Sequence, residues 1–167
     1  MKKQHRRGSA VAYDKGGKII DCENLDCSFI MNSPATIENI LKCDAYCKQK
    51  LPEEYKYFLK YYDGGILYKY ENLGGFKFLS TQEIIDANEL QKTIYEEYWD
   101  GSIIFFCELL GTGEYLGFKI SDTASYKIVH SETAQHEEEW IVAGNSFDAL
   151  IELIISEKGK ECCWFQT

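Results

Sequence analysis

The sequence lacks long apolar runs and is poor in histidine. Its 167 residues include three histidines. Ser131 and Cys107 are the available nucleophiles, and neither lies in a nucleophile-elbow pattern, so the sequence does not predict a hydrolase. The longest strongly apolar run, residues 103–107, is far too short to span a bilayer. We therefore expect neither hydrolytic chemistry nor insertion into a membrane.

Positive charge is also scarce. The chain has 18 Lys and Arg against 27 Asp and Glu, a net charge of -9. This balance argues against a nucleic-acid-binding surface, which usually needs a basic patch. The negative charge is unevenly distributed along the chain. Residues 51–167 carry 9 basic and 21 acidic residues, whereas residues 1–50 have a net charge of +3. The acidic half indicates either solubility alone or complementarity to a basic partner.

Phosphate-binding loops are absent as well. The segment Gly111-Thr112-Gly113 lacks a third glycine and a following helix. The pair Gly74-Gly75 lacks the lysine and hydroxyl of a P-loop. Both segments therefore predict turns, and we expect no cofactor.

The seven cysteines form no metal-binding or disulfide framework that spacing would indicate. Cys22 and Cys27 are separated by four residues, and Cys43 and Cys47 by three, whereas zinc knuckles use tighter pairs. An odd number of thiols is typical of a reducing compartment. No apolar segment follows the basic start to make a secretory signal. We expect a cytoplasmic protein without a bound metal.

Residues 51–67 contain the signals of a complete short helix. Pro52 stands where the first helical residue needs no N–H, and Glu53 and Glu54 suit the positive end of the helix dipole. Gly64-Gly65 predicts the end of the helix, because glycine reaches the left-handed conformation without a Cβ clash. An apolar stripe at i, i+3, i+4 and i+7 lies between these signals: Tyr55, Phe58, Leu59 and Tyr62.

This motif resembles the signature of the SUKH superfamily, which includes fungal cell-wall-assembly regulators and bacterial toxin-immunity proteins. Three further segments agree in order: a first helix at 36–41, a strand at 76–80 and a closing element at 140–147. The resemblance covers residues 33–157. It implies structural roles for the motif residues Leu51, Pro52, Tyr55, Phe58, Leu59, Gly64, Gly65, Trp140 and Phe147.

Two helices, two strands and a third helix are expected in the first half of the chain. Strands are expected at 66–70 and 76–79. Ser80 and Glu83 have the spacing of a capping box, so a helix should run from there to about residue 98. An earlier helix over residues 34–47 would bury Ile37, Ile40, Leu41 and Cys47.

An antiparallel meander and a closing helix are predicted in the second half. The nearly continuous apolar run at 102–109 is typical of a central strand buried on both faces. Short turns join it to strands at 115–120 and 126–130, and a parallel pairing would need longer connections. Ser146 can cap a last helix ending at Gly159. Its expected buried stripe is Phe147, Leu150, Ile151, Ile154 and Ile155.

These elements predict a single α+β domain, with an antiparallel or mixed sheet and helices packed on one side. Residues 33–157 make up the SUKH-like domain. Residues 1–32 form an N-terminal extension, with a basic arm and a hairpin around residues 11–20. Residues 158–167 form a C-terminal tail.

The resemblance implies a binding protein and not an enzyme. Its members include immunity proteins, which would occlude the active site or substrate groove of a cognate toxin domain. Many of these toxins are nucleases with basic substrate surfaces, and an acidic inhibitor would associate with them quickly. The alternative is an intracellular regulatory or scaffold module of the same fold. The sequence leaves the oligomeric state open.

One acidic and aromatic segment, residues 95–100, stands out as a partner-binding candidate. Aromatic anchors mixed with charge suit a protein interface, although the same aromatics could close the core at a helix end. Acids in the predicted meander add steering charge. The full candidate set is Tyr95, Glu96, Glu97, Tyr98, Trp99, Asp100, Glu108 and Glu114.

Overall fold

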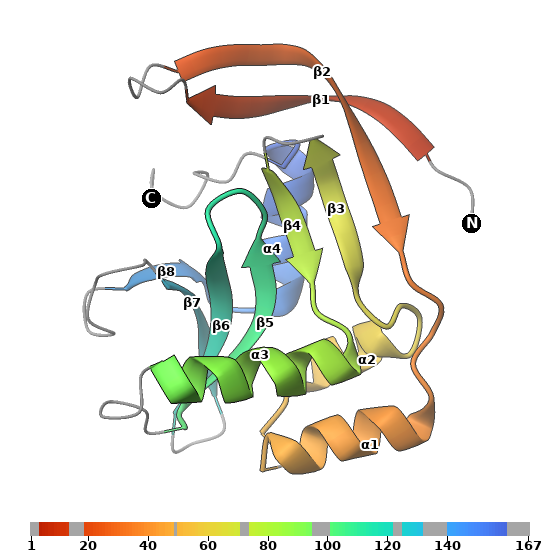
Figure 1. Ribbon diagram of the computed structural model, residues 1–167, viewed down its shortest axis with the longest axis vertical. Helices are drawn as coiled ribbons and strands as arrows, with labels where there is room; N and C mark the ends of the chain where they lie inside the picture. The colour runs from red at the N-terminus through yellow and green to blue at the C-terminus, as the bar shows by residue number, and fades with distance from the viewer. Residues whose placement is uncertain are drawn as a thin grey trace.

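A computed structural model describes residues 4–13, 19–48, 50–70, 74–94, 101–121, 125–131 and 140–159, with side chains from residue 27 onwards. Within these ranges, eight strands form one antiparallel sheet in chain order (Figure 1). The strands are β1 Gln4–Tyr13, β2 Ile19–Met31, β3 Gly65–Tyr70, β4 Gly74–Phe78, β5 Ile103–Leu109, β6 Glu114–Ile120, β7 Tyr126–Ser131 and β8 Ile141–Gly144. The helices are α1 Ile37–Tyr46, α2 Glu53–Leu59, α3 Thr81–Ile94 and α4 Phe147–Ser156. The predicted α+β class and antiparallel meander are confirmed.

The N-terminal extension contributes to the sheet. The expected hairpin is present in the backbone, with Tyr13 paired to Ile19 and a turn that lies outside the described residues. Residues 4–7, expected in a basic arm, belong instead to β1. Only the last residues of β2 pair with β3, at Ser28, Ile30 and Met31. The rest of the hairpin therefore projects beyond the other strands, as Figure 1 shows.

Strand β5 is buried on both faces, as its apolar run predicted. Phe105 and Phe106 are each 0% exposed and point to opposite sides. Phe106 stacks on Phe118 of β6, with ring centroids 3.9 Å apart. Phe105 packs on the other face against Tyr115 and Trp140. A register shift between Phe105 and Cys107 marks a bulge that places both Phe106 and Cys107 in the main core.

All four described helices contribute to one main core. Cys43 of α1, Tyr55 of α2, Ile84 of α3 and Phe147 of α4 belong to the same buried cluster as Phe106. Figure 1 shows α4 behind the strands, with the other three helices gathered across one end of the sheet. The core therefore lies between the helices and one face of the meander.

The predicted inward face of α1 was partly wrong. Ile40, Cys43 and Cys47 are buried, whereas Ile37 and Leu41 are 76% and 63% exposed. The helix packs mainly against α3. The buried stripe on α1 is narrower than the full set of apolar residues on this helix. Successive helical residues are rotated by about 100°. Ile37 and Leu41 therefore fall to the side of the stripe.

The predicted buried faces of α2 and α4 were also wrong at some positions. Tyr55 and Leu59 are fully buried as expected, whereas Phe58 is only partly buried and Tyr62 is 44% exposed. The reason is that α2 ends at Leu59, so Tyr62 does not continue its stripe. In α4, Phe147, Leu150 and Ile154 are buried, whereas Ile155 is exposed at the margin of the buried arc.

Gly64 does not end the helix directly, because α2 stops five residues earlier. Its φ of 75° is the expected left-handed conformation. A Cβ here would also lie 2.6 Å from the main-chain O of Phe78 and the N of Ser80. Glycine is therefore needed because the chain passes against the end of β4.

The hydroxyl of Tyr55 joins three elements inside the core. It donates to the main-chain oxygens of Leu79 (2.8 Å) and Phe106 (3.1 Å). Its ring contacts Phe106, Phe118 and Phe147 edge-on. Burial raises the pKa of this hydroxyl well above its usual range, so it remains a donor. Tyr55 therefore ties α2 to the segment after β4 and to β5.

We expect Tyr55→Phe to lower the free energy of unfolding by about 1–3 kcal/mol, because it leaves a buried carbonyl without its donor. Urea denaturation of the full chain measures this change. Tyr61→Phe is the matched control, since it removes an exposed hydroxyl, and should cost less than about 0.5 kcal/mol. Equal losses in the two variants would contradict a special role for the buried hydroxyl.

Candidate protein-interaction surface

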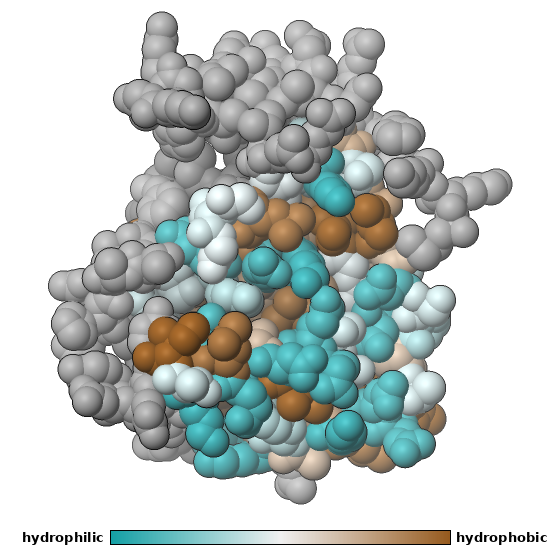
Figure 2. Space-filling model, in the orientation of Figure 1, coloured by the Kyte–Doolittle hydropathy of each residue, from teal (hydrophilic) through white to brown (hydrophobic). Residues whose placement is uncertain are grey.

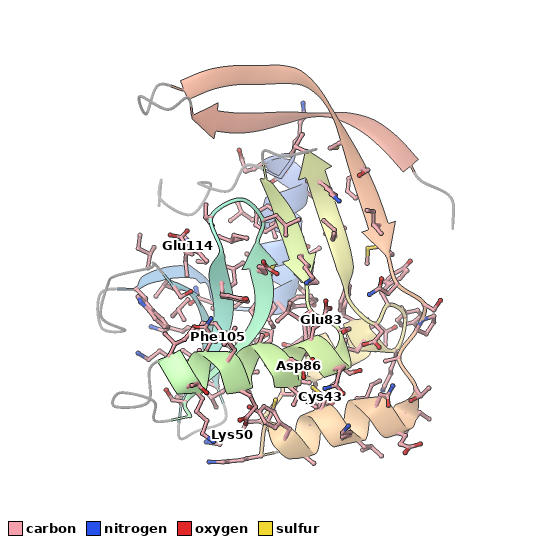
Figure 3. All side chains as sticks on the ribbon, viewed as in Figure 1. Cys43, Lys50, Glu83, Asp86, Phe105 and Glu114 are labelled. Atoms are coloured by element: carbon pink, nitrogen blue, oxygen red, sulfur yellow. The ribbon has the colours of Figure 1, made fainter. Side chains whose placement is uncertain are left out.

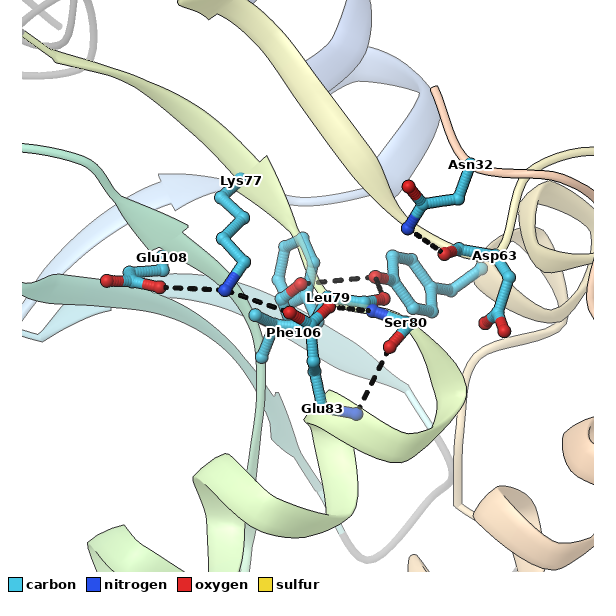
Figure 4. Close-up of polar contacts among 9 residues, drawn as sticks. Asn32, Asp63, Lys77, Leu79, Ser80, Glu83, Phe106 and Glu108 are labelled. Carbon is cyan, nitrogen blue, oxygen red and sulfur yellow. Dashed lines mark hydrogen bonds and ion pairs between the residues drawn. The ribbon is translucent and has the colours of Figure 1, made fainter. Parts of the chain in front are cut away.

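Asp63 fixes the start of α3. Its carboxylate accepts hydrogen bonds from the main-chain N (2.7 Å) and hydroxyl (3.3 Å) of Thr81. Its main-chain oxygen accepts from the side chain of Asn32 at 2.7 Å (Figure 4). A carboxylate at the N-terminus of a helix satisfies N–H groups that have no partner within the helix. Asp63 thus connects the chain after α2 to α3.

The predicted capping box at Ser80 and Glu83 is confirmed. The Ser80 N–H donates to the Glu83 carboxylate at 2.9 Å, and the Glu83 N–H donates to the Ser80 hydroxyl at 3.2 Å. Lys77 of β4 lies between two acids, 2.9 Å from Glu83 and 3.4 Å from Glu108 (Figure 4). The charge of Glu108, a predicted partner contact, is therefore already paired within the molecule.

Glu108 and Glu114 lie on opposite faces of the sheet. In the pairing of β5 with β6, Glu108 lies opposite Tyr115 and Leu109 lies opposite Glu114. Successive residues of a strand point to opposite faces. Glu114 lies 3.0 Å from the ring of His130, which is 3% exposed. The structure therefore does not bring these two candidate acids together on one surface, and the other six candidates lie outside the described residues.

Two exposed apolar side chains lie at the C-terminal end of α3. Leu90 and Ile94 are 56% and 59% exposed. Figure 2 shows an apolar patch over this end of α3. Residue 95, the first of the acidic and aromatic segment, follows Ile94 directly in the chain. This pair was not predicted from the sequence, although the i, i+4 spacing of Leu90 and Ile94 places both on one side of a helix.

Asn88 holds α3 firmly against β5. Its side chain donates to the main-chain O of Phe105 and accepts from the N–H of the same residue, both at 2.9 Å. It also donates to the main-chain O of Ile84 at 2.8 Å. Asn88 is 3% exposed, and it pairs with β5 as a neighbouring strand would. The exposed pair of Leu90 and Ile94 is therefore presented on a fixed helix.

A comparison with known protein families identifies the family of this chain. A family model described as the SMI1 / KNR4 family (SUKH-1) matches residues 34–153, which is most of the chain. The chain belongs to the SUKH-1 family. No curated protein gave a match. The matched part of this SUKH-1 chain runs from the segment before α1 into α4 and contains the contacts of Tyr55 and those between Asp63 and Thr81.

The residues considered for hydrolytic chemistry serve the fold of the SUKH-1 domain. The hydroxyl of Ser131 donates to the main-chain O of Tyr115 and accepts from its N–H, at 3.1 and 3.0 Å. Cys107 is 0% exposed, and His130 lies beside Glu114. Ser131 is 7% exposed. Because its hydroxyl makes both of these bonds, it is not presented to a substrate. The described positions of Ser131 and Cys107 are therefore structural.

The cysteines considered for zinc lie in the core wherever their side chains are described. Cys27, Cys43 (labelled in Figure 3), Cys47 and Cys107 are buried, and the side chain of Cys22 lies outside the described residues. A hydrogen bond to Cys47, together with burial, raises the pKa of the Cys43 thiol. Among the described residues there is no group of three or more His, Cys, Asp or Glu placed to hold a metal. No helix in the described ranges is long and apolar enough to cross a membrane.

The Glu83 cap makes a testable contribution to stability. Burial alone would raise the pKa of its carboxyl, but the Ser80 N–H and Lys77 outweigh this effect and lower the pKa. A lowered pKa contributes stability above the unfolded value of about 4.3, and this stability is lost as the pH falls through the folded value. Glu83→Gln should therefore lower the urea midpoint at neutral pH, and the deficit should shrink in acid.

Urea denaturation at several pH values between about 7 and 3 tests this expectation. Glu152→Gln, on the exposed side of α4, is the matched control and should differ little from the wild type throughout. A Glu83→Gln deficit that stays constant over the whole range would show that the charge of Glu83 is not responsible.

Proposed function

We propose that this SUKH-1 protein is a bacterial immunity protein that binds and occludes a cognate toxin domain in the cytoplasm. The family match over residues 34–153 carries the proposal, because the superfamily includes toxin-immunity proteins. The net charge of -9 favours a toxin with a basic substrate surface, such as a nuclease. Complementary charge raises the rate of encounter between such partners.

The contact surface in this proposal is centred on the C-terminal end of α3. Leu90 and Ile94 supply exposed apolar area, and the segment 95–100 would add aromatic anchors and acids. Tyr and Trp are common at the energetic centres of interfaces. Glu108 is half-buried and bound to Lys77, so it would contribute at the rim at most.

Occlusion needs a preformed surface and no turnover. A stable protein interface typically buries about 1,200–2,000 Å² in total. The bonds from Asn88 to β5 hold α3 in place before any partner arrives. Less ordering is then required on binding, which leaves more of the contact energy for affinity.

Co-expression provides the direct test of immunity. Cells that produce the toxin domain encoded beside this protein should survive only when the full chain is also made, and the two proteins should co-purify. A catalytically inactive toxin domain provides the control for expression burden. Absence of both rescue and complex would reject immunity and favour the regulatory scaffold of the same fold.

Binding kinetics with the inactivated toxin domain test the surface. The double change Glu96→Lys and Glu97→Lys should slow association and weaken its salt dependence, since rim charges act on encounter. Ile94→Ala and Trp99→Ala should instead raise the dissociation rate, by about tenfold for an anchor residue.

Glu152→Lys on α4 is the matched control for the charge reversal. It changes the net charge of the chain by the same amount per residue but lies on another element, so it should affect association much less. Equal slowing by the two kinds of variant would show that only net charge matters and would remove residues 95–100 from the proposed surface.

A further inference from the structure

A groove of about 700 Å³ opens beside the start of α2. Three parts of the chain that are distant in sequence line it: the residues around the start of α2, the residues at the end of β6 and the start of β7, and the residue after β8. This groove lies apart from α3, and neither Leu90 nor Ile94 lines it. Its lining includes Leu51, Pro52, Glu54, Ile120, Tyr126 and Asn145.

The floor of the groove is apolar. Leu51 is 3% exposed, Pro52 is buried, and Ile120 is a partly buried residue packed against the main core. An apolar floor with polar walls suits a long amphipathic side chain, whose alkyl stem lies on apolar surface while its charged end reaches a polar group.

Glu54 provides the charged group in the wall. The Tyr126 hydroxyl accepts from the N–H of Phe147 at 3.0 Å. Burial, together with the negative charge of the nearby Glu54 carboxylate, raises the pKa of this hydroxyl. Glu53 also lines the groove, but its side chain is 87% exposed and is paired with Lys56 at 2.6 Å. Lys50 adds one exposed cation at the rim. Glu54 is thus the carboxylate that is positioned here.

The opposite wall is polar and held in shape. The N–H of Ser121 donates to the main-chain O of Ser125 at 2.8 Å, and their hydroxyls lie 2.6 Å apart. The N–H of Leu51 donates to Asp44 at 3.3 Å, which fixes the entry to α2. The groove therefore exists before a ligand binds, and little ordering is needed on binding.

We propose that this groove receives an arginine side chain from a loop of the protein partner. The guanidinium would donate to the Glu54 carboxylate, and the alkyl stem would lie on Pro52 and Ile120. A planar guanidinium matches a carboxylate with two parallel hydrogen bonds. The toxin domain as the source of this arginine rests on the proposed function, whereas the preference of the groove for arginine does not.

Titration of the full chain with short peptides tests the groove. The probe is N-acetyl-Gly-Arg-Gly-amide, and its control contains citrulline, which has a similar shape without the charge. Backbone amide signals of Ser121, Ser125 and Asn145 should shift saturably, with roughly tenfold tighter binding of the arginine peptide. Glu54→Gln should reduce the affinity for the arginine peptide to that for the citrulline peptide. Glu152→Gln should leave the preference for the arginine peptide intact.

Equal binding of the two peptides, shifts confined to other parts of the chain, or an unchanged preference in Glu54→Gln would each overturn the groove assignment. A thermal melt of Glu54→Gln verifies that the variant is folded. The two proposals fail separately. Toxin rescue without an arginine preference would reject the groove alone, and an arginine preference without rescue would reject immunity alone.

Discussion

The buried hydroxyl of Tyr55 is the contact on which the arrangement of this domain depends. The helix that carries it has only seven residues, too few to be stable by itself in water. Its position comes from tertiary contacts, because the hydroxyl reaches two carbonyls of neighbouring chain segments while the ring packs among three phenylalanines. A phenylalanine would fill most of the same volume but would leave the carbonyl of Leu79 without this donor.

The motif residues Tyr55 and Gly64 therefore serve the fold and do not reveal the partner. Tyr55, Asp63 and Gly64 hold α2, the end of β4 and the start of α3 together within a short distance. The exposed side chains Leu90 and Ile94 lie outside that motif, on a helix that these contacts position. A fixed scaffold with variable exposed residues is how one fold can serve many partners, because function depends on the surface and not on the fold.

Much of the fold followed from the sequence because its signals are local. The box of Ser80 and Glu83, the cap at Ser146 and the apolar run of β5 each depend on residues close together in the chain. The errors arose where neighbours distant in sequence decide the outcome. Ile37 and Leu41 have a helical period that fits burial, but the partner surface of α1 is too narrow to cover them.

The candidate site was harder to predict for the same reason. Whether Glu108 and Glu114 share a face depends on strand register, and their spacing in the sequence does not show that they diverge. The internal pairing of Glu108 with Lys77 likewise needs the positions of β4 and β5. The groove beside α2 combines three distant segments, so no window of the sequence could indicate it.

The side chain of Asn88 also covers main-chain groups at the edge of a strand. Unpaired N–H and C=O groups along a strand offer a template for pairing with another chain, and proteins commonly cover or interrupt such edges. Phe105 lies where β4 has already ended, and Asn88 occupies both of its main-chain groups. One amide thus closes an apolar strand that would otherwise expose hydrogen-bonding groups suited to aggregation.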